Sequence, residues 1–274
     1  AGLSFVYVPF DWSTEIFRAR QMVSERLSAM EEGLPADVIP RMGPISSVMG
    51  EIMQIAIPID TARISPMQVR EYADWVLRPR LMAIPGIAQV IPIGGEVRQF
   101  QVQPDTRRMA ELEISLEQLE AAIRGFSSNT SGGFLELTGR EYLIRNLGRT
   151  SNLEDLKNLA ITARDGQPIL LRQIATVTFA PALRRGDAGF EGKPAVILGI
   201  QKQPTADTIH LTRSIEAALD EMKKSLPAGM EAPQVTFRQA SFIEASIGTL
   251  QGKLIGASVF VAAILFFFLG TLRP

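Results

Sequence analysis

The sequence predicts an α+β fold in which small split βαβ units are separated by an inserted α+β segment and are followed by one transmembrane helix. The first observation is the order of periodic patterns along the chain. A β-α-β pattern is followed by a segment with a different order of strands and helices, and then by a second β-α-β pattern. The second is the stretch Leu254–Leu272, whose 19 residues carry no charged side chain. Roughly 20 apolar residues cross a hydrocarbon core of about 30 Å, so this stretch is long enough to span a membrane.

The N-terminal region predicts a strand followed by an amphipathic helix. Residues Leu3–Pro9 are rich in β-forming side chains, and either Asp11 or Ser13 could cap the helix that follows. Gly33–Pro35 ends that helix. The apolar residues at helical spacing, which we expect to face inward, are Ile16, Ala19, Val23, Leu27 and Met30.

The first βαβ pattern follows. Ile52–Ile59 alternates its apolar residues and predicts a strand. Ser65–Gln68 forms a capping box with proline at the first helical position, and the helix should end before Pro85. A second strand is expected over Ala88–Ile93, where Gly94 and Gly95 end it. The expected inward residues of the helix are Val69, Ala73, Val76 and Leu81.

The inserted segment predicts a second small α+β unit. It opens with a strand at Val97–Val102, and Ser115–Gln118 is another capping box. Ser127–Gly133 is expected to be a loop. The remaining elements are a hairpin of Phe134–Leu137 and Tyr142–Leu147, a helix at Leu153–Leu159, a hairpin of Ala160–Ala163 and Ile169–Leu171, and a strand at Ala175–Phe179.

The second βαβ pattern lies between this segment and the apolar stretch. Ala195–Gln201 and Val235–Phe237 predict strands, and Thr205–Leu226 predicts the helix between them. Its expected inward residues are Ile209, Thr212, Ile215, Leu219 and Met222.

Composition excludes several classes of function. The chain has no cysteine, so thiolate nucleophiles and cysteine-ligated zinc or iron–sulfur sites are excluded, and its one histidine, His210, leaves no basis for a histidine-rich site. A net charge of −1 gives no electrostatic case for binding nucleic acid. We therefore expect no active site and no cofactor.

A series of short stretches carries a resemblance to a known family. They are Gly33–Pro35 with Gly43-Pro44, Gly50–Ile52, Pro85–Val90, Pro104-Asp105 with Arg108–Ala110, Ile114–Leu116, Ser131–Gly133, Glu141–Arg145 with Gly148-Arg149, Leu153–Leu156, Arg184–Asp187, Leu226–Gly229 and Phe268–Arg273. In this order, and over essentially the whole chain, they resemble the resistance–nodulation–division (RND) transporters, and within them the heavy-metal efflux branch.

The resemblance implies a domain layout. Residues 1–47 are similar to part of the first porter subdomain, and residues 48–94 and 184–238 to the two parts of the second porter subdomain. Residues 95–183 are similar to the docking subdomain inserted into it, and residues 240–272 to a transmembrane helix and its lead-in. Because Ala1 is not Met and the apolar stretch lies close to Pro274, we expect an internal part of a larger membrane protein.

The resemblance also implies a transporter and its assembly. It implies a proton-driven antiporter, not an enzyme, that exports divalent heavy-metal cations as a homotrimer. The implied partners are a periplasmic adaptor (membrane fusion) protein and an outer-membrane channel protein. The expected location is the bacterial inner membrane, with residues 1 to about 245 in the periplasm and Arg273 on the cytoplasmic side.

Glu51 is the candidate metal-path residue, with Met49 and Met53 nearby. A carboxylate favours a harder divalent ion such as zinc, cobalt or nickel, whereas thioethers favour copper(I) or silver. The alternative is a solvated acid at the end of a strand, with two methionines that pack in the core. Leu183, which is apolar where a methionine could have served, argues against a soft metal.

Other singled-out residues have plainer alternatives. His210 is expected on the polar edge of its helix, without a second ligand three or four residues away. Arg184 and Arg185 either pair with acids of a neighbouring subunit or belong to a solvated linker.

Two other functions remain open. One is an RND multidrug efflux permease, against which the short Gly132–Gly139 connection with few aromatic residues nearby argues, because drug clefts are lined by apolar and aromatic side chains. The other, from a different class, is a tail-anchored interaction domain that transports nothing. Apolar segments before Ala1 and after Pro274 in the gene would distinguish a transporter from such a domain.

Overall fold

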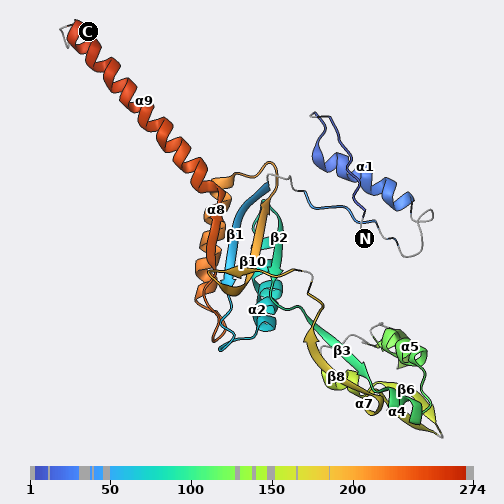
Figure 1. The fold of residues 1–274 in the computed structure, drawn as a ribbon. Helices are drawn as coiled ribbons and strands as arrows, with labels where there is room; N and C mark the ends of the chain where they lie inside the picture. The colour runs from blue at the N-terminus through green and yellow to red at the C-terminus, as the bar shows by residue number, and fades with distance from the viewer. Residues whose placement is uncertain are drawn as a thin grey trace.

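The computed structural model describes residues 4–11, 13–30, 38, 40–45, 50–126, 130–137, 140–146, 152–164, 166–184 and 186–269. Its centre is an antiparallel sheet of strands β1 (Glu51–Pro58), β2 (Ile87–Gly94), β10 (Lys193–Lys202) and β11 (Gln234–Arg238), in the order β11-β1-β10-β2. A short strand β9 (Gly189–Phe190) pairs with β10. We call this the central sheet (Figure 1).

The topology of the central sheet is that of two split βαβ units. Strands β1 and β2 are joined by α2 (Pro66–Tyr72), a π-helical turn η3 (Ala73–Leu77) and α3 (Arg78–Met82). Strands β10 and β11 are joined by α8 (Thr208–Lys223). Because β10 pairs antiparallel with both β1 and β2, each unit brackets a strand of the other. The predicted split βαβ arrangement is confirmed.

The core lies between one face of the central sheet and these helices. On β1, Met53, Ile55 and Ile57 alternate toward the helices, as strand geometry requires. Val196, Leu198 and Ile200 do the same on β10. The helices contribute Val69, Ala73, Leu77, Leu81, Leu211, Ile215, Leu219 and Met222. The opposite face of the sheet is not covered by these helices.

The π-helical turn changes which residue faces the core. In a regular helix Pro79 would have to donate a hydrogen bond to the carbonyl of Trp75, but proline has no N–H and its ring would clash there. The chain widens instead, and Arg78 N–H bonds to the carbonyl of Ala73. The prediction that Val76 faces inward is therefore wrong: Val76 is 45% exposed, whereas Leu77 is fully buried.

Helix α8 buries four of its five predicted inward residues and two further residues. Thr212, Ile215, Leu219 and Met222 are buried as expected, while Ile209 is only half-buried. Leu211 and Ala218 are also buried. The helix begins at Thr208, because the carboxylate of Asp207 accepts the backbone N–H of His210 and caps it there.

The segment between β2 and β9 contains a second, smaller core. Its elements are β3 (Arg98–Pro104), α4 (Thr106–Glu111), α5 (Leu116–Phe126), β4 (Thr130–Leu137), β5 (Arg140–Asn146), α6 (Leu153–Lys157), β6 (Ala160–Arg164), β7 (Gln167–Leu170), α7 (Leu171–Ile174) and β8 (Ala175–Pro181). Strand β3 pairs with β8, and β6 with β7. Met109, Leu119, Leu156, Leu171 and Ile174 are among the buried residues of this core.

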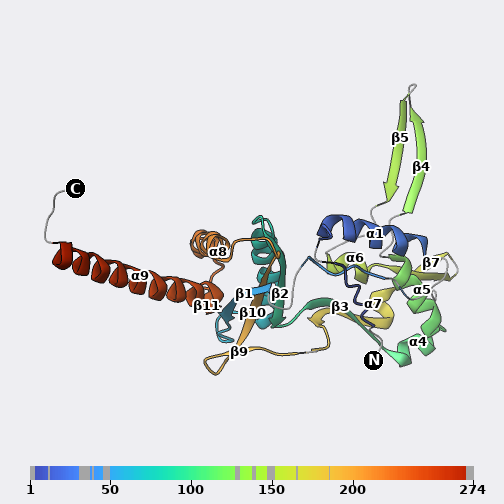
Figure 2. The ribbon, with the colours of Figure 1, turned by 90° about the horizontal axis from the view of Figure 1, so that it is seen from above.

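Strands β4 and β5 form the predicted hairpin and extend away from the rest of this segment (Figure 2). The strand is longer than expected. Residues 130–133 belong to β4, and Thr130 and Ser131 pair with β5, so the predicted loop at Ser127–Gly133 is wrong over that part. Residues 127–129 lie outside the described residues. Pairing across a hairpin overrides the turn-like composition of this stretch.

The N-terminal helix α1 (Ile16–Ala29) forms as predicted, but with a different cap and without the preceding strand. The carboxylate of Glu15 accepts the backbone N–H groups of Phe17 and Arg18, in place of Asp11 or Ser13. Residues 4–10 are not in a strand, because a strand needs a hydrogen-bonded neighbour and they pair with no described segment. The predicted helix end at Gly33–Pro35 lies outside the described residues.

The apolar stretch belongs to one long helix, α9 (Gln239–Leu269), which leaves β11 and extends away from the central sheet (Figure 1). Within the described residues it is the one helix long and apolar enough to cross a membrane. Ala240 is its one buried residue. The expected end of the span, Gly270–Leu272, lies outside the described residues.

Candidate functional site

The face of the central sheet that the helices leave uncovered carries the candidate site. Residues opposite each other in an antiparallel pair lie on the same face. Glu51 of β1 is opposite Gln201 of β10, which is opposite Gln89 of β2. One carboxylate and two amides therefore form a polar row across three strands. The neighbouring row consists of Phe237, Gln54, Gly199 and Ile91.

Glu51 is held in this row by its immediate neighbours. Its side chain is half-buried, and Glu51 Oε1 accepts a hydrogen bond of 2.7 Å from Gln54 Nε2. Gly199 of β10 lies beside the carboxylate, because a Cβ at that position would be in contact with Glu51 Oε1 at 3.4 Å. The register of β1 shifts between Glu51 and Met53, which frees Glu51 from the alternation of the strand that follows.

The row supplies oxygen ligands of the kind that harder divalent cations accept. It offers the carboxylate of Glu51 and the amide oxygens of Gln201 and Gln89, and Gln54 of the neighbouring row adds a third amide. The described residues hold no group of three or more histidine, cysteine, aspartate or glutamate side chains that could bind a metal ion. A single carboxylate with amides suits brief contact with a passing ion better than tight storage.

Of the two methionines predicted near Glu51, the described residues include Met53. Met53 is fully buried in the core between the sheet and the helices, so its sulfur packs among Ile55 and Ile57, away from the uncovered face. Met49 lies outside the described residues. Glu51 therefore shares its face with amides and not with the thioether of Met53.

The other singled-out residues lie away from this row. His210 is exposed on α8. Arg184 forms ion pairs with Glu96 and, at 3.8 Å, with Asp187. Leu183 is exposed, and Arg185 lies outside the described residues.

A cluster of charges joins the central sheet to α9, and sequence reasoning missed it. Arg238, the last residue of β11, donates to Glu216 of α8 at 2.8 Å and to Glu244 of α9 at 2.6 Å. Arg213 of α8 lies 3.7 Å from Glu244. Hydrogen bonds from Arg238 to Glu244 and then to Glu216 raise the pKa of Arg238 above its ordinary value. The sequence contained one indication of this cluster, because Glu244 is the one charged residue between Gln239 and Gly252.

Comparison with known proteins places the chain in a family. The model of the AcrB/AcrD/AcrF family matches residues 1–274. Protein HelA of Legionella pneumophila is 32% identical over 278 residues, and the cobalt-zinc-cadmium resistance protein CzcA of Cupriavidus metallidurans is 31% identical over 279 residues. The cation efflux system protein CusA of Escherichia coli strain K12 is 31% identical over 274 residues. Each match covers 99% of this chain and 26% of the relative.

A solved structure agrees at the level of fold. The crystal structure of a heavy metal efflux pump superposes with a TM-score of 0.79 over 96% of this chain and 26% of that chain, at 23% identity. This chain thus spans about a quarter of the length of the proteins that it matches. The family model, which matches the whole chain, shows that the chain belongs to the AcrB/AcrD/AcrF family of RND transporters, and the relatives above show that it is similar to members of the heavy-metal efflux branch.

Proposed function

We propose that this chain is the periplasmic part of an inner-membrane permease that exports divalent heavy-metal cations, together with one of the permease's membrane helices. Similarity to CzcA over 99% of the chain is the observation that carries the proposal, because the name of that relative states resistance to cobalt, zinc and cadmium. The oxygen-bearing row around Glu51 supports the same class of ion.

The proposed layout follows the resemblance. Residues 1–47 form part of the first porter subdomain, residues 48–94 and 184–238 the second, and residues 95–183 the docking subdomain. Residues 240–272 contain the membrane helix and its lead-in. The two separate hydrophobic cores support this division, because one belongs to the central sheet and the other to the segment between β2 and β9.

In the proposed mechanism, the porter subdomains rock against each other and open the cleft between them alternately toward the entrance and the exit of the transport path. Glu51 binds the cation briefly as it passes. Protons move through carboxylates of membrane helices outside this chain and drive the cycle. The Arg238 cluster supports a coupling role for α9, because it ties the helix to α8 and β11 at once.

The proposed assembly is a homotrimer in the inner membrane, with residues up to about 245 in the periplasm. A periplasmic adaptor protein and an outer-membrane channel complete the export route. Similarity to CusA, named a cation efflux system protein, supports a role in cation export.

The test is a resistance panel. The full-length gene is expressed in an efflux-deficient host, and growth inhibition is measured for zinc, cobalt, nickel, cadmium, copper and silver beside a set of dyes and detergents. We expect protection against zinc, cobalt, nickel or cadmium, relative to an empty vector. Protection against dyes and detergents without protection against any metal would replace the proposal with multidrug export.

A further inference from the structure

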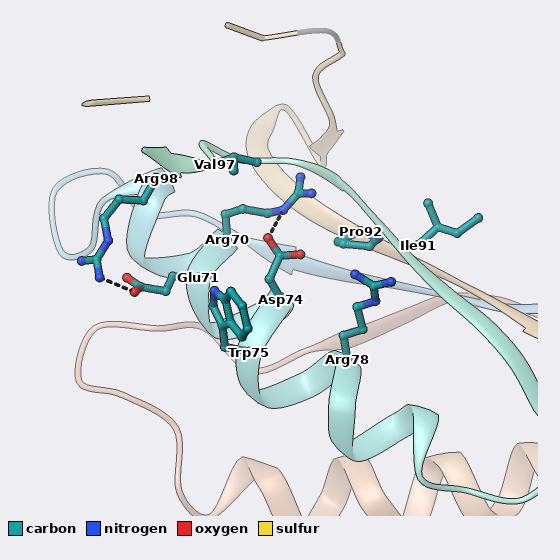
Figure 3. A pocket seen from close by; sticks show the side chains of 9 residues that line it. All are labelled: Arg70, Glu71, Asp74, Trp75, Arg78, Ile91, Pro92, Val97 and Arg98. Atoms are coloured by element: carbon teal, nitrogen blue, oxygen red, sulfur yellow. Dashed lines mark hydrogen bonds and ion pairs between the residues drawn. The ribbon is translucent and has the colours of Figure 1, made fainter. Parts of the chain in front are cut away.

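A cavity lies at strand β2 and is distinct from the polar row of Glu51, Gln201 and Gln89. It has a volume of about 770 Å³ and is lined by Arg70, Glu71, Asp74, Trp75, Arg78, Ile91, Pro92, Val97 and Arg98 (Figure 3). Strand β2 is an edge strand, because it lies at the end of the order β11-β1-β10-β2. The cavity is therefore bounded by the sheet edge on one side and by the α2–η3–α3 helix on the other.

The charges around the cavity do not balance. Arg70 Nε lies 2.9 Å from Asp74, and Arg70 also donates to the carbonyl of Gly94 at 2.6 Å. Arg98 lies 2.6 Å from Glu71. Each carboxylate thus has its own guanidinium. Arg78 makes no ion pair with any described residue, so its positive charge is uncompensated in the described part of the cavity.

The side chain of Arg78 is directed at the cavity. Figure 3 shows it extending from the helix toward Ile91 and Pro92, while Asp74 turns toward Arg70. The guanidinium therefore faces an apolar wall with no acid of its own. A planar guanidinium in such a setting recognises a carboxylate through paired N–H donors.

Trp75 supplies an aromatic surface at the same cavity. Trp75 is 77% exposed, whereas tryptophan is highly buried on average. The π-helical turn produces this exposure, because it turns Leu77 into the core and leaves Trp75 and Val76 outside. Such turns occur often at functional sites.

We propose that this cavity binds an organic anion in which a carboxylate is attached to an aromatic or apolar group. The carboxylate pairs with Arg78, and the apolar group packs on Trp75 and against Ile91 and Val97. The volume is in the range of sites that enclose a small organic molecule, which is roughly 300–1,000 Å³. The proposal does not depend on metal export.

The test uses the fluorescence of Trp75 in the full chain in detergent. The sequence has two tryptophans, so a Trp12→Phe background leaves Trp75 as the single reporter. Phenylacetate is titrated beside its neutral analogue phenylacetamide. We expect a saturable change in emission with phenylacetate and none with phenylacetamide over the same concentrations. The same titration with an N-acetylated, C-amidated Phe-Asp dipeptide shows whether a free acid or an acidic side chain binds more tightly.

The control variants lie on the same helix. Arg78→Gln should weaken binding by about tenfold or more, and Arg78→Lys by less, because lysine keeps the charge and loses the paired geometry. Arg80→Gln should change nothing, since Arg80 pairs with Glu221 and does not line the cavity. No saturable change with any carboxylate, an equal response to phenylacetamide, or unchanged binding by Arg78→Gln would overturn the proposal.

Discussion

Glu51 is a half-buried acid whose hydrogen-bond partner among the described residues is an amide and not a cation. Its negative charge is therefore available to a passing ion, and the amides of Gln201 and Gln89 extend the same row. A surface acid without such a setting contributes little to folding or function. A residue on the transport path and a solvated acid at a strand end therefore differ in what the loss of this charge should do.

Glu51→Gln tests this distinction, because it keeps the shape of the side chain and removes the charge. In the full-length pump we expect lower zinc and cobalt tolerance at unchanged protein level and trimer assembly. Glu117→Gln, at an exposed position on α5, is the matched control. If Glu51 is only a solvated acid, the substitution should change stability by about 0.5 kcal/mol or less and leave metal tolerance unchanged. Equal tolerance of parent and mutant across a metal titration would therefore remove Glu51 from the path.

At the scale of elements, the π-helical turn decides which side chains stabilise the central sheet. Pro79 forces the wider turn, and the wider turn moves the inward position from Val76 to Leu77. A regular helical repeat applied to the sequence predicts the opposite assignment.

Leu77→Ala and Val76→Ala make a matched pair for this turn. Leu77→Ala should lower the free energy of unfolding by about 2–5 kcal/mol, because it leaves a cavity in the core. Val76→Ala should cost clearly less, since Val76 is largely outside the core. Chemical denaturation of the full chain in detergent measures both. A larger loss for Val76→Ala would mean that the helix is regular and the turn is absent.

Two capping boxes fix where helices begin. The hydroxyl of Ser65 accepts the backbone N–H of Gln68, and that of Ser115 accepts the backbone N–H of Gln118, each at 3.2 Å. Ser65→Ala and Ser115→Ala should each lower stability by about 0.5–2 kcal/mol. Ser214→Ala is the control, because Ser214 bonds only within helix α8. Melting curves identical to the parent would place these helix starts elsewhere.

The Arg238 cluster is the element that joins the central sheet to α9. If it couples the two, Arg238→Gln should reduce metal transport more than it reduces protein level or assembly. Arg213→Gln should have a smaller effect, since Arg213 is more exposed and lies farther from Glu244. Transport is compared at matched expression. A proportional loss of protein and transport would assign Arg238 a purely structural role.

Across the whole chain, most of the strands, the caps at Ser65 and Ser115 and the long apolar helix were predictable, because each is encoded by local periodicity and local side-chain chemistry. The acid at Glu51, directly before the apolar strand Ile52–Ile59, was also visible in the sequence. Other features depend on contacts between distant segments. The absence of a strand at residues 4–10 depends on a missing pairing partner, and the extension of β4 to Thr130 depends on a partner being present.

The same reason explains what was missed at the site. Met53 is adjacent to Glu51 in sequence, but the register shift and the alternation of β1 bury it in the core. Arg238 and Glu244 are six residues apart, which is not a regular helical spacing. They meet because the chain turns from β11 into α9, with Glu216 brought in by α8.

Proton-driven export of a divalent metal can be measured with the purified full-length pump. The pump is reconstituted into vesicles that contain a zinc-sensitive dye, and an outward-directed proton gradient is imposed. We expect zinc entry that depends on the gradient, stops when the gradient is collapsed, and falls with Glu51→Gln. Zinc entry that does not depend on the gradient would contradict proton-driven metal export. The absence of zinc entry, in vesicles whose pump transports an organic drug, would contradict it as well.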